Sequence, residues 1–221
     1  MKVHVKGIRD TPFQDQGAAN TCAANVCREM SLFAGVDVSV MWSYFIGRVA
    51  GGNTELLDDG VALSTLLEAV EEFGVVSEEE WPFDPYQLSS PPPRPLHISP
   101  CPITYARVSH RDVLRLLKNN FPVAAVVETS DAFVDFVSSP ELTSNVFAGA
   151  GKDDTSPLGH AVLLVGWDST IGGPGGSFVA LSSWGKSWGE CGSAYLPATF
   201  IHDTARSEQF YVATSRDTLL L

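Results

Sequence analysis

A proline tract near the middle of the chain constrains its fold more than any other feature. Residues 91–95 read Pro-Pro-Pro-Arg-Pro and follow a pair of serines. Consecutive prolines fix φ and remove backbone donors, so the tract must be extended. Helical patterns dominate before it and strand patterns after it. We therefore expect a strap between two lobes; a ligand for a proline-recognition domain is the alternative interpretation.

Two segments before the tract carry helical patterns. Cys22–Phe33 places its apolar residues on one helical stripe, and Asn20 and Thr21 offer capping groups just upstream. Val61–Phe73 repeats such a stripe, and Gly74 is suited to end it. We expect a helix in each segment, the first beginning at Cys22.

The part after the tract is dominated by strand patterns. One more helical stripe covers His110–Asn119, and segments rich in β-branched and aromatic residues then predict strands over 122–128, 161–167, 178–182 and 209–214. The glycine-rich run 172–176 lies between two of these strands and is typical of a hairpin loop, since it lacks the ending of a phosphate-binding loop. The second half should form a sheet or barrel.

Charge and cysteine content exclude several classes of function. The formal charge is −12, from 26 acidic and 14 basic residues, which opposes nucleic-acid and anionic-membrane partners. No apolar run is long enough to span a membrane, and residues 1–6 lack the apolar core of a signal peptide. The four cysteines are irregularly spaced without a Cys-x-x-Cys pair, so we expect free thiols and no metal site.

Cys22 is the first candidate for chemistry. The unpaired N–H groups at a helix N-terminus favour a thiolate there, although a cysteine at such a position is more often a small buried apolar residue. Gln16 and Gly17 precede Cys22 closely, and His160 follows it by 138 residues. That interval fits the ~130–150 residues that separate nucleophile and base in one class of cysteine hydrolases.

Three segments together resemble the papain family of cysteine peptidases. Residues 15–24, Asp-Gln-Gly-Ala-Ala-Asn-Thr-Cys-Ala-Ala, resemble the family's active-site segment, and the lead-in 12–17 is similar to that of bacterial members. Residues 159–167 are similar to the family's His-Ala-Val-x-x-Val-Gly-Tyr strand. Residues 181–192 are similar to its Asn-Ser-Trp-Gly-x-x-Trp-Gly-x-x-Gly signature.

The resemblance implies a papain-like α+β fold in a single peptidase domain over residues 1–221. It predicts a helical lobe over approximately 10–95 and a β-barrel lobe over 96–221, with residues 1–9 packing on the barrel lobe. The active site is expected in the cleft between the lobes.

The same resemblance implies a catalytic mechanism. Cys22 and His160 form a thiolate–imidazolium pair that attacks a carbonyl, and the side chain of Gln16 and the backbone N–H of Cys22 hold the oxyanion. Ser182 stands where the family has the asparagine that orients the histidine. A serine hydroxyl is shorter, so we expect it to hold His160 directly or through one water, with the ring less firmly fixed.

Substrate-binding residues are also implied by the resemblance. We expect Asn20, Gly60 and Gly159 to line the non-primed side of the cleft. Trp184 and Trp188 are expected to contact the substrate, with Trp188 on the primed side. Gly159 is small and should leave room near the base. The acidic loop 57–59 either favours basic substrates or is simply solvated.

These observations favour hydrolysis of peptide bonds without a cofactor or metal. Two alternatives stay open: an acyltransferase or transpeptidase that uses the same dyad, and a weak or inactive peptide-binding scaffold, suggested by Ser182. We expect a peptide or protein substrate and a monomer. The Gln-Gly motif begins about 15 residues from Met1, so we expect a cytoplasmic enzyme, or one secreted or delivered to a target cell without a signal peptide.

Overall fold

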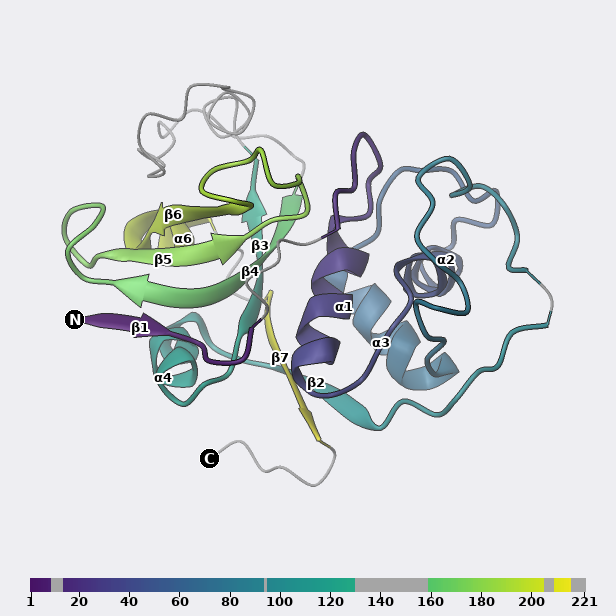
Figure 1. Cartoon of the computed structure of the whole chain (residues 1–221), viewed down its shortest axis with the longest axis horizontal. Coiled ribbons are helices and arrows are strands. Elements are labelled where there is room, and N and C mark those ends of the chain that lie inside the picture. Colours follow the sequence, from purple (N-terminus) through teal and green to yellow (C-terminus); the bar gives the residue numbers. More distant parts are fainter. Residues whose placement is uncertain (9–13, 94, 130–158, 205–208, 216–221) are drawn as a thin grey trace. The chain divides into compact units, whose positions relative to one another are not determined.

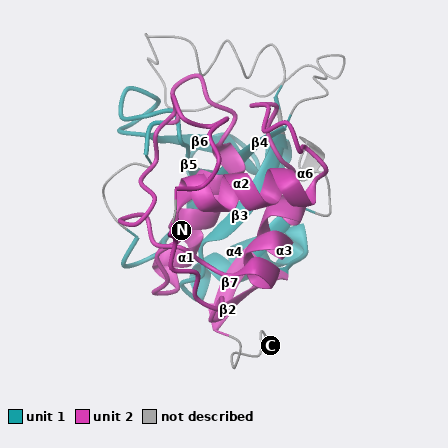
Figure 2. Ribbon diagram, turned by 90° about the vertical axis from the view of Figure 1, so that its right-hand side faces the viewer, with its two compact units in different colours: residues 1–15, 107–211 teal, residues 16–106, 212–221 magenta. Residues whose placement is uncertain are grey.

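The computed structural model describes residues 1–8, 14–93, 95–129, 159–204 and 209–215 (Figure 1). The chain divides into two compact units, shown in Figure 2. Unit 1 comprises residues 1–15 and 107–211, and unit 2 comprises residues 16–106 and 212–221. The described part of the proline tract lies within unit 2. Pro12, Phe13 and Arg94, which belong to predicted motifs, lie outside the described residues.

Unit 2 is built on three helices that pack against one another, followed by a short strand. These elements are α1 (Cys22–Phe33), α2 (Val40–Ala50), α3 (Leu63–Phe73) and β2 (Ile103–Arg107). Met30, Tyr44 and Leu66 are fully buried in its core. A Cβ at Gly47 of α2 would lie only 3.1 Å from the Cβ of Leu66, so this glycine lets α2 and α3 approach closely.

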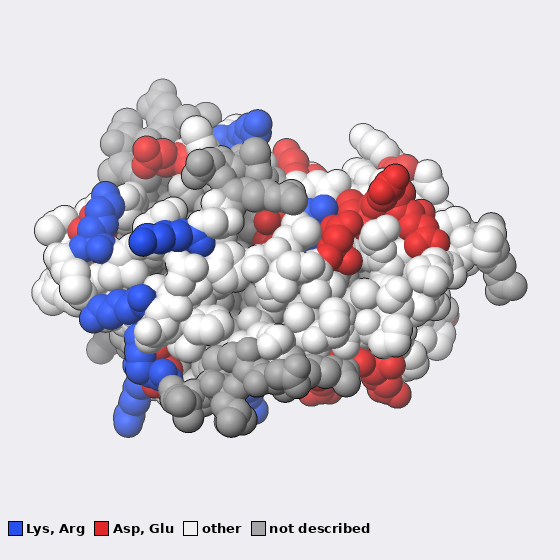
Figure 3. All heavy atoms as spheres, turned by 60° about the horizontal axis from the view of Figure 1, so that its bottom comes forward, with Lys and Arg blue, Asp and Glu red and all other residues white. Residues whose placement is uncertain are grey.

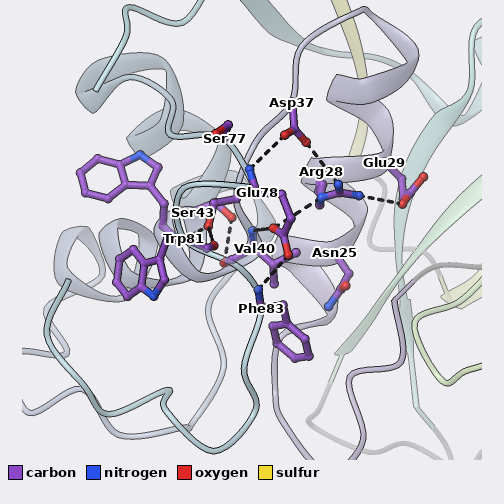
Figure 4. A network of polar contacts seen from close by, with 12 residues as sticks. Asn25, Arg28, Glu29, Asp37, Val40, Ser43, Ser77, Glu78, Trp81 and Phe83 are labelled. Carbon is purple, nitrogen blue, oxygen red and sulfur yellow. Dashed lines mark hydrogen bonds and ion pairs between the residues drawn. The ribbon is translucent and has the colours of Figure 1, made fainter. Parts of the chain in front are cut away.

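A polar network joins α1 of unit 2 to the loop that precedes α2 and to the segment 77–83 (Figure 4). Arg28 of α1 forms ion pairs with Asp37 at 3.2 Å and with Glu78 at 3.5 Å. The Glu78 carboxylate also accepts the N–H of Val40, the first residue of α2, at 2.9 Å, and the N–H of Phe83 at 2.8 Å. The carboxylate of Glu78 therefore binds the first N–H of α2, an N–H of the segment 77–83 and the guanidinium of Arg28.

Unit 1 contains an antiparallel sheet. Its strands are ordered β7-β3-β4-β5-β6, and β1 pairs with β4 beyond the end of β3. The helix α4 packs on β1, β3 and β4, and α6 packs on β3 and β6. The elements are β1 (Lys2–His4), η1 (His110–Asp112), α4 (Val113–Lys118), β3 (Val123–Glu128), β4 (Gly159–Asp168), β5 (Ser177–Leu181), β6 (Ser193–Pro197), α6 (Ala198–Thr204) and β7 (Phe210–Ser215).

The predicted α+β class is confirmed, and most of the predicted elements are present with shifts of a few residues at their ends. The run 172–176 forms the loop between the antiparallel strands β4 and β5, as expected. One detail differs: among the described residues of unit 1 the sheet is open, because β7 and β6 lie at the two ends of its strand order and do not pair with each other. The β-barrel lobe is implied by the family resemblance, whereas the strand patterns alone are compatible with either a sheet or a barrel.

Charge is distributed unevenly between the two units. Unit 1 contains 10 Lys and Arg residues against 13 Asp and Glu residues, a formal charge of −3, whereas unit 2 contains 4 against 13, a formal charge of −9. On the face drawn in Figure 3, acidic side chains (red) predominate over the residues of unit 2, and basic side chains (blue) gather over those of unit 1. None of the helices in the described ranges has the length and apolar composition needed to cross a membrane.

Candidate active site

Residues 16–21 precede α1 in unit 2 and are called the nucleophile loop after the predicted role of Cys22. Gln16 is buried, its carbonyl accepts the N–H of Ala19 at 3.1 Å, and its side-chain amide donates to the carbonyl of Ala19. Gly17 has φ +57°, a conformation that favours glycine in such a tight turn. Cys22 is the first residue of α1, is half-buried and does not form a disulfide. The predicted helix start at Cys22 is confirmed.

The predicted capping of α1 by the side chain of Thr21 is wrong. Thr21 occupies the N-cap position but makes no side-chain capping bond. Its hydroxyl instead accepts the side-chain amide of Asn25 at 3.1 Å, because the buried Asn25 amide requires acceptors of its own. Cys27, which lies further along α1, is fully buried.

Asp58 is not simply a solvated charge of the acidic loop. Its carboxylate accepts the backbone N–H of Asn20 and the hydroxyl of Tyr44. Sequence reasoning missed Tyr44 because the helix that carries it, α2, was not predicted. A capping signal was present, since the hydroxyl of Ser39 accepts the N–H of Trp42 at the start of α2.

His160 is the second residue of β4 in unit 1, opposite Val127 of β3. Its Nε2 lies 2.9 Å from the Oγ of Ser182, which follows β5. The imidazole also stacks on the indole of Trp184, with ring centroids 3.8 Å apart and planes inclined by 13°. The predicted direct contact between Ser182 and His160 is therefore present, and an aromatic ring supports the imidazole from one face.

Burial controls the charge of His160. The side chain is 4% exposed, and desolvation lowers its pKa to about 3. Loss of water disfavours the charged form of an imidazole unless an opposite charge compensates for it. Within unit 1, burial therefore favours the neutral form of the His160 imidazole.

The two tryptophans of the Trp-Gly motif lie beside this histidine. Trp188 is buried and packs edge-on against Trp184, with centroids 5.7 Å apart and an interplanar angle of 74°. Gly185 has φ +78°, and a Cβ there would lie 2.5 Å from the carboxylate of Asp15. The glycine is thus required by both conformation and packing.

Gly159 does not simply leave space near the base. A Cβ at this position would lie 2.8 Å from Cγ1 of Val126 on the neighbouring strand β3. The side chain of Val126 therefore occupies the space next to Gly159 on that side. The structure brings together four of the predicted site residues in unit 1, His160, Ser182, Trp184 and Trp188. In unit 2, Gln16 and Asn20 lie on the nucleophile loop, and Cys22 lies at the start of α1. Gly60 lies on the adjoining loop of residues 53–60, called the Asp58 loop.

The sequence of the chain is similar to those of known proteins. The model of the family described as papain family cysteine protease matches residues 59–206, about two thirds of the chain. An uncharacterised peptidase C1-like protein of Acanthamoeba polyphaga mimivirus is 22% identical over 220 residues, which cover 90% of this chain and 68% of the viral protein.

Two solved structures are similar over nearly the whole chain. Xylellain, a cysteine protease from Xylella fastidiosa, is 26% identical with a TM-score of 0.75, covering 97% of this chain and 85% of xylellain. The clostridial cysteine protease Cwp84 after propeptide cleavage shares the fold at 16% identity, with a TM-score of 0.66 over 94% of this chain and 56% of the clostridial chain. The chain therefore belongs to the papain family of cysteine proteases.

Proposed function

We propose that the protein hydrolyses peptide bonds with Cys22 as nucleophile and His160 as general base and acid. The observation that carries the proposal is the position of His160, buried, stacked on Trp184 and in direct contact with Ser182. Such a ring is held in one orientation before substrate arrives, which is what proton transfer at a fixed atom requires. The family relationship supports the choice of cysteine chemistry.

The contact with Ser182 assigns a role to each ring nitrogen. Because Nε2 faces the serine hydroxyl, Nδ1 is the nitrogen that exchanges a proton with the thiol of Cys22 and with the leaving amine. The attacking sulfur forms a bond to the carbonyl carbon, and the C–N bond breaks as the amine takes the proton from Nδ1. Water then cleaves the acyl-enzyme by the same route.

Charge compensation is central to this mechanism. A neutral, desolvated imidazole gains a proton readily only when a negative charge lies close to it. The Cys22 thiolate supplies that charge, and the first N–H groups of α1 stabilise the thiolate in turn. The backbone N–H of Cys22 and the side-chain amide of Gln16 are the proposed donors to the oxyanion.

Covalent labelling tests the assignment of the nucleophile. A peptidyl epoxide should add one equivalent to Cys22, located by mass spectrometry after digestion, and should abolish cleavage of a fluorogenic peptide library. Cys22→Ala should neither label nor cleave, whereas Cys191→Ala, which removes the exposed thiol, should do both. Labelling of another cysteine with full inhibition would contradict the proposal.

Product analysis with the unlabelled, active enzyme separates hydrolysis from its alternatives. Acyl transfer would give amide products in place of acids when an amine nucleophile is added at low concentration, and a peptide-binding scaffold would give neither product. We propose a peptide or protein substrate for a monomer that binds neither nucleic acid nor membranes, which the net charge of −12 supports. Light scattering checks the monomeric state, and filter binding of DNA at low salt checks the lack of nucleic-acid binding.

A further inference from the structure

Asp58 is bonded to the nucleophile loop at the residue that lies two positions before Cys22. The backbone N–H of Asn20 donates to both carboxylate oxygens of Asp58, at 3.1 and 3.2 Å. The side-chain amide of Asn20 donates to the backbone carbonyl of Asp58 at 2.7 Å. Three hydrogen bonds therefore join residues 38 positions apart in the sequence and restrain the chain between Gln16 and Cys22.

The carboxylate of Asp58 is itself fixed by a buried tyrosine. The hydroxyl of Tyr44 in α2 donates to Oδ1 of Asp58 at 2.5 Å and accepts the N–H of Gly60 at 3.2 Å. Burial, and then the hydrogen bond and charge of Asp58, raise the pKa of Tyr44 well above its usual value. The phenol therefore stays protonated at neutral pH and donates to the carboxylate.

A buried arginine, Arg48, contacts the Asp58 loop, residues 53–60. The guanidinium of Arg48 lies 4.1 Å from the centroid of the Tyr44 ring. It donates to the carbonyls of Leu56 at 2.7 Å and Leu57 at 3.1 Å. Leu56 has φ +56°, which is costly for a leucine and persists only where surrounding contacts hold it. The loop is thus built as a rigid support for Asp58.

We propose that Asp58 is a positioning residue for acyl transfer: anchored by Tyr44, it holds the nucleophile loop so that Gln16 and the N–H of Cys22 are aligned on the developing oxyanion. This inference rests on the proposed function of Cys22 and Gln16. Oxyanion donors act only when held at the correct place in advance, and a displacement near 1 Å lowers the rate about 100-fold. A carboxylate that accepts two donors is a strong restraint on such a loop.

The effect is expected in kcat, measured per mole of enzyme titrated with the peptidyl epoxide so that unfolded molecules do not count. Asp58→Ala should lower kcat about 10- to 100-fold with KM changed less than about 3-fold, because the donors act on the transition state. Tyr44→Phe should lower kcat less, and the double variant should lose no more than Asp58→Ala alone, because both act through one restraint. Asp58→Asn, which keeps one acceptor oxygen, should fall between Asp58→Ala and the wild type.

Two controls keep the interpretation sharp. Glu55→Gln removes a charge from the same loop at an exposed site and should leave kcat unchanged. Alkylation of Cys22 by iodoacetamide needs no oxyanion donors, so its rate in Asp58→Ala should stay within about 3-fold of the wild type. An unchanged kcat in Asp58→Ala, or an alkylation rate that falls in parallel with kcat, would overturn the inference. Neither result touches the labelling of Cys22, which tests the proposed function separately.

Discussion

The hydroxyl group that contacts His160 differs chemically from the side chain amide it replaces in the family signature. An asparagine can present a carbonyl that only accepts, so the ring nitrogen facing it must carry the proton. The hydroxyl of Ser182 both donates and accepts, and its 2.9 Å contact with Nε2 is compatible with either tautomer of the ring. Stacking on Trp184 restrains the plane of the imidazole but not its proton.

Substitution of Ser182 should therefore change turnover more than binding. Ser182→Ala removes the hydroxyl that contacts Nε2 of the ring and should lower kcat/KM about 10- to 100-fold, the usual effect of losing an orienting group. Ser182→Asn should lose less, because an amide oxygen restores an acceptor. Steady-state kinetics on one peptide decide this, with Ser187→Ala at an exposed position of the same motif as control. Equal activity of Ser182→Ala and the control would contradict the role.

The protonation of His160 should depend on the thiol. In Cys22→Ala the negative charge is missing, so burial alone acts and the imidazole should stay neutral down to about pH 4. The pKa of His160 is about 3 in the folded state and near the ordinary 6.5 in the unfolded state. Between these two pH values only the unfolded state binds a proton at His160, so the free energy of unfolding falls as the pH is lowered from about 6.5 to 3. NMR titration, assigned with His160→Gln, measures this; a midpoint near 6.5 in Cys22→Ala would contradict it.

Sequence patterns predicted the residues whose chemistry is local and missed those that act by long-range contact. Cys22 and His160 stand in recognisable motifs, and the contact of Ser182 followed from its place in the signature. Nothing near Asp58 in the sequence indicates Tyr44, which lies 14 positions earlier on another element. An acidic pair in a loop has the same local pattern whether water or a buried phenol surrounds it.

Among the helices of unit 2, α2 shows why element prediction failed where it did. Its sequence, Val-Met-Trp-Ser-Tyr-Phe-Ile-Gly-Arg-Val-Ala, is apolar on nearly all sides, because residues on several faces are buried. A stripe is visible only when one face is polar, as in α1 and α3, which were predicted. Ser43 and Arg48 are polar yet buried, so they did not mark a solvent face.

The contacts of Glu78 at the start of α2 should contribute to the free energy of unfolding of unit 2. Glu78→Gln replaces one acceptor oxygen with a donor facing the N–H of Val40 or Phe83 and weakens the ion pair with Arg28 (Figure 4). We expect the free energy of unfolding to fall by about 1.5–3 kcal/mol, the range for hydrogen bonds to charged groups. Urea unfolding measures the change, and Glu79→Gln, exposed beside it, should change stability by less than about 0.5 kcal/mol. Equal losses in both variants would rule out the network as the cause.

At the scale of the whole molecule, the charge is carried mainly by the unit that contains Cys22. Unit 2 has a formal charge of −9 from its 13 acidic and 4 basic residues. Two of those four, Arg28 and Arg48, are engaged in internal contacts. Composition alone predicted the net charge of −12, but not this division, because residues 1–15 join the second half of the chain in unit 1.

The negative electrostatic field of unit 2 should attract positively charged substrates toward Cys22 and repel negatively charged ones. For a peptide with two lysines and no acidic residue, kcat/KM should fall about 3- to 10-fold as salt is raised from 10 to 500 mM, because the Debye length shrinks from about 30 Å to well below 10 Å. An otherwise identical peptide with two glutamates should show the opposite slope, and a neutral peptide should show little change. Because all three share one cleavage site, any effect of salt on catalysis itself cancels in their ratios. Parallel salt profiles for the three peptides would mean that the field of unit 2 does not reach the approaching substrate.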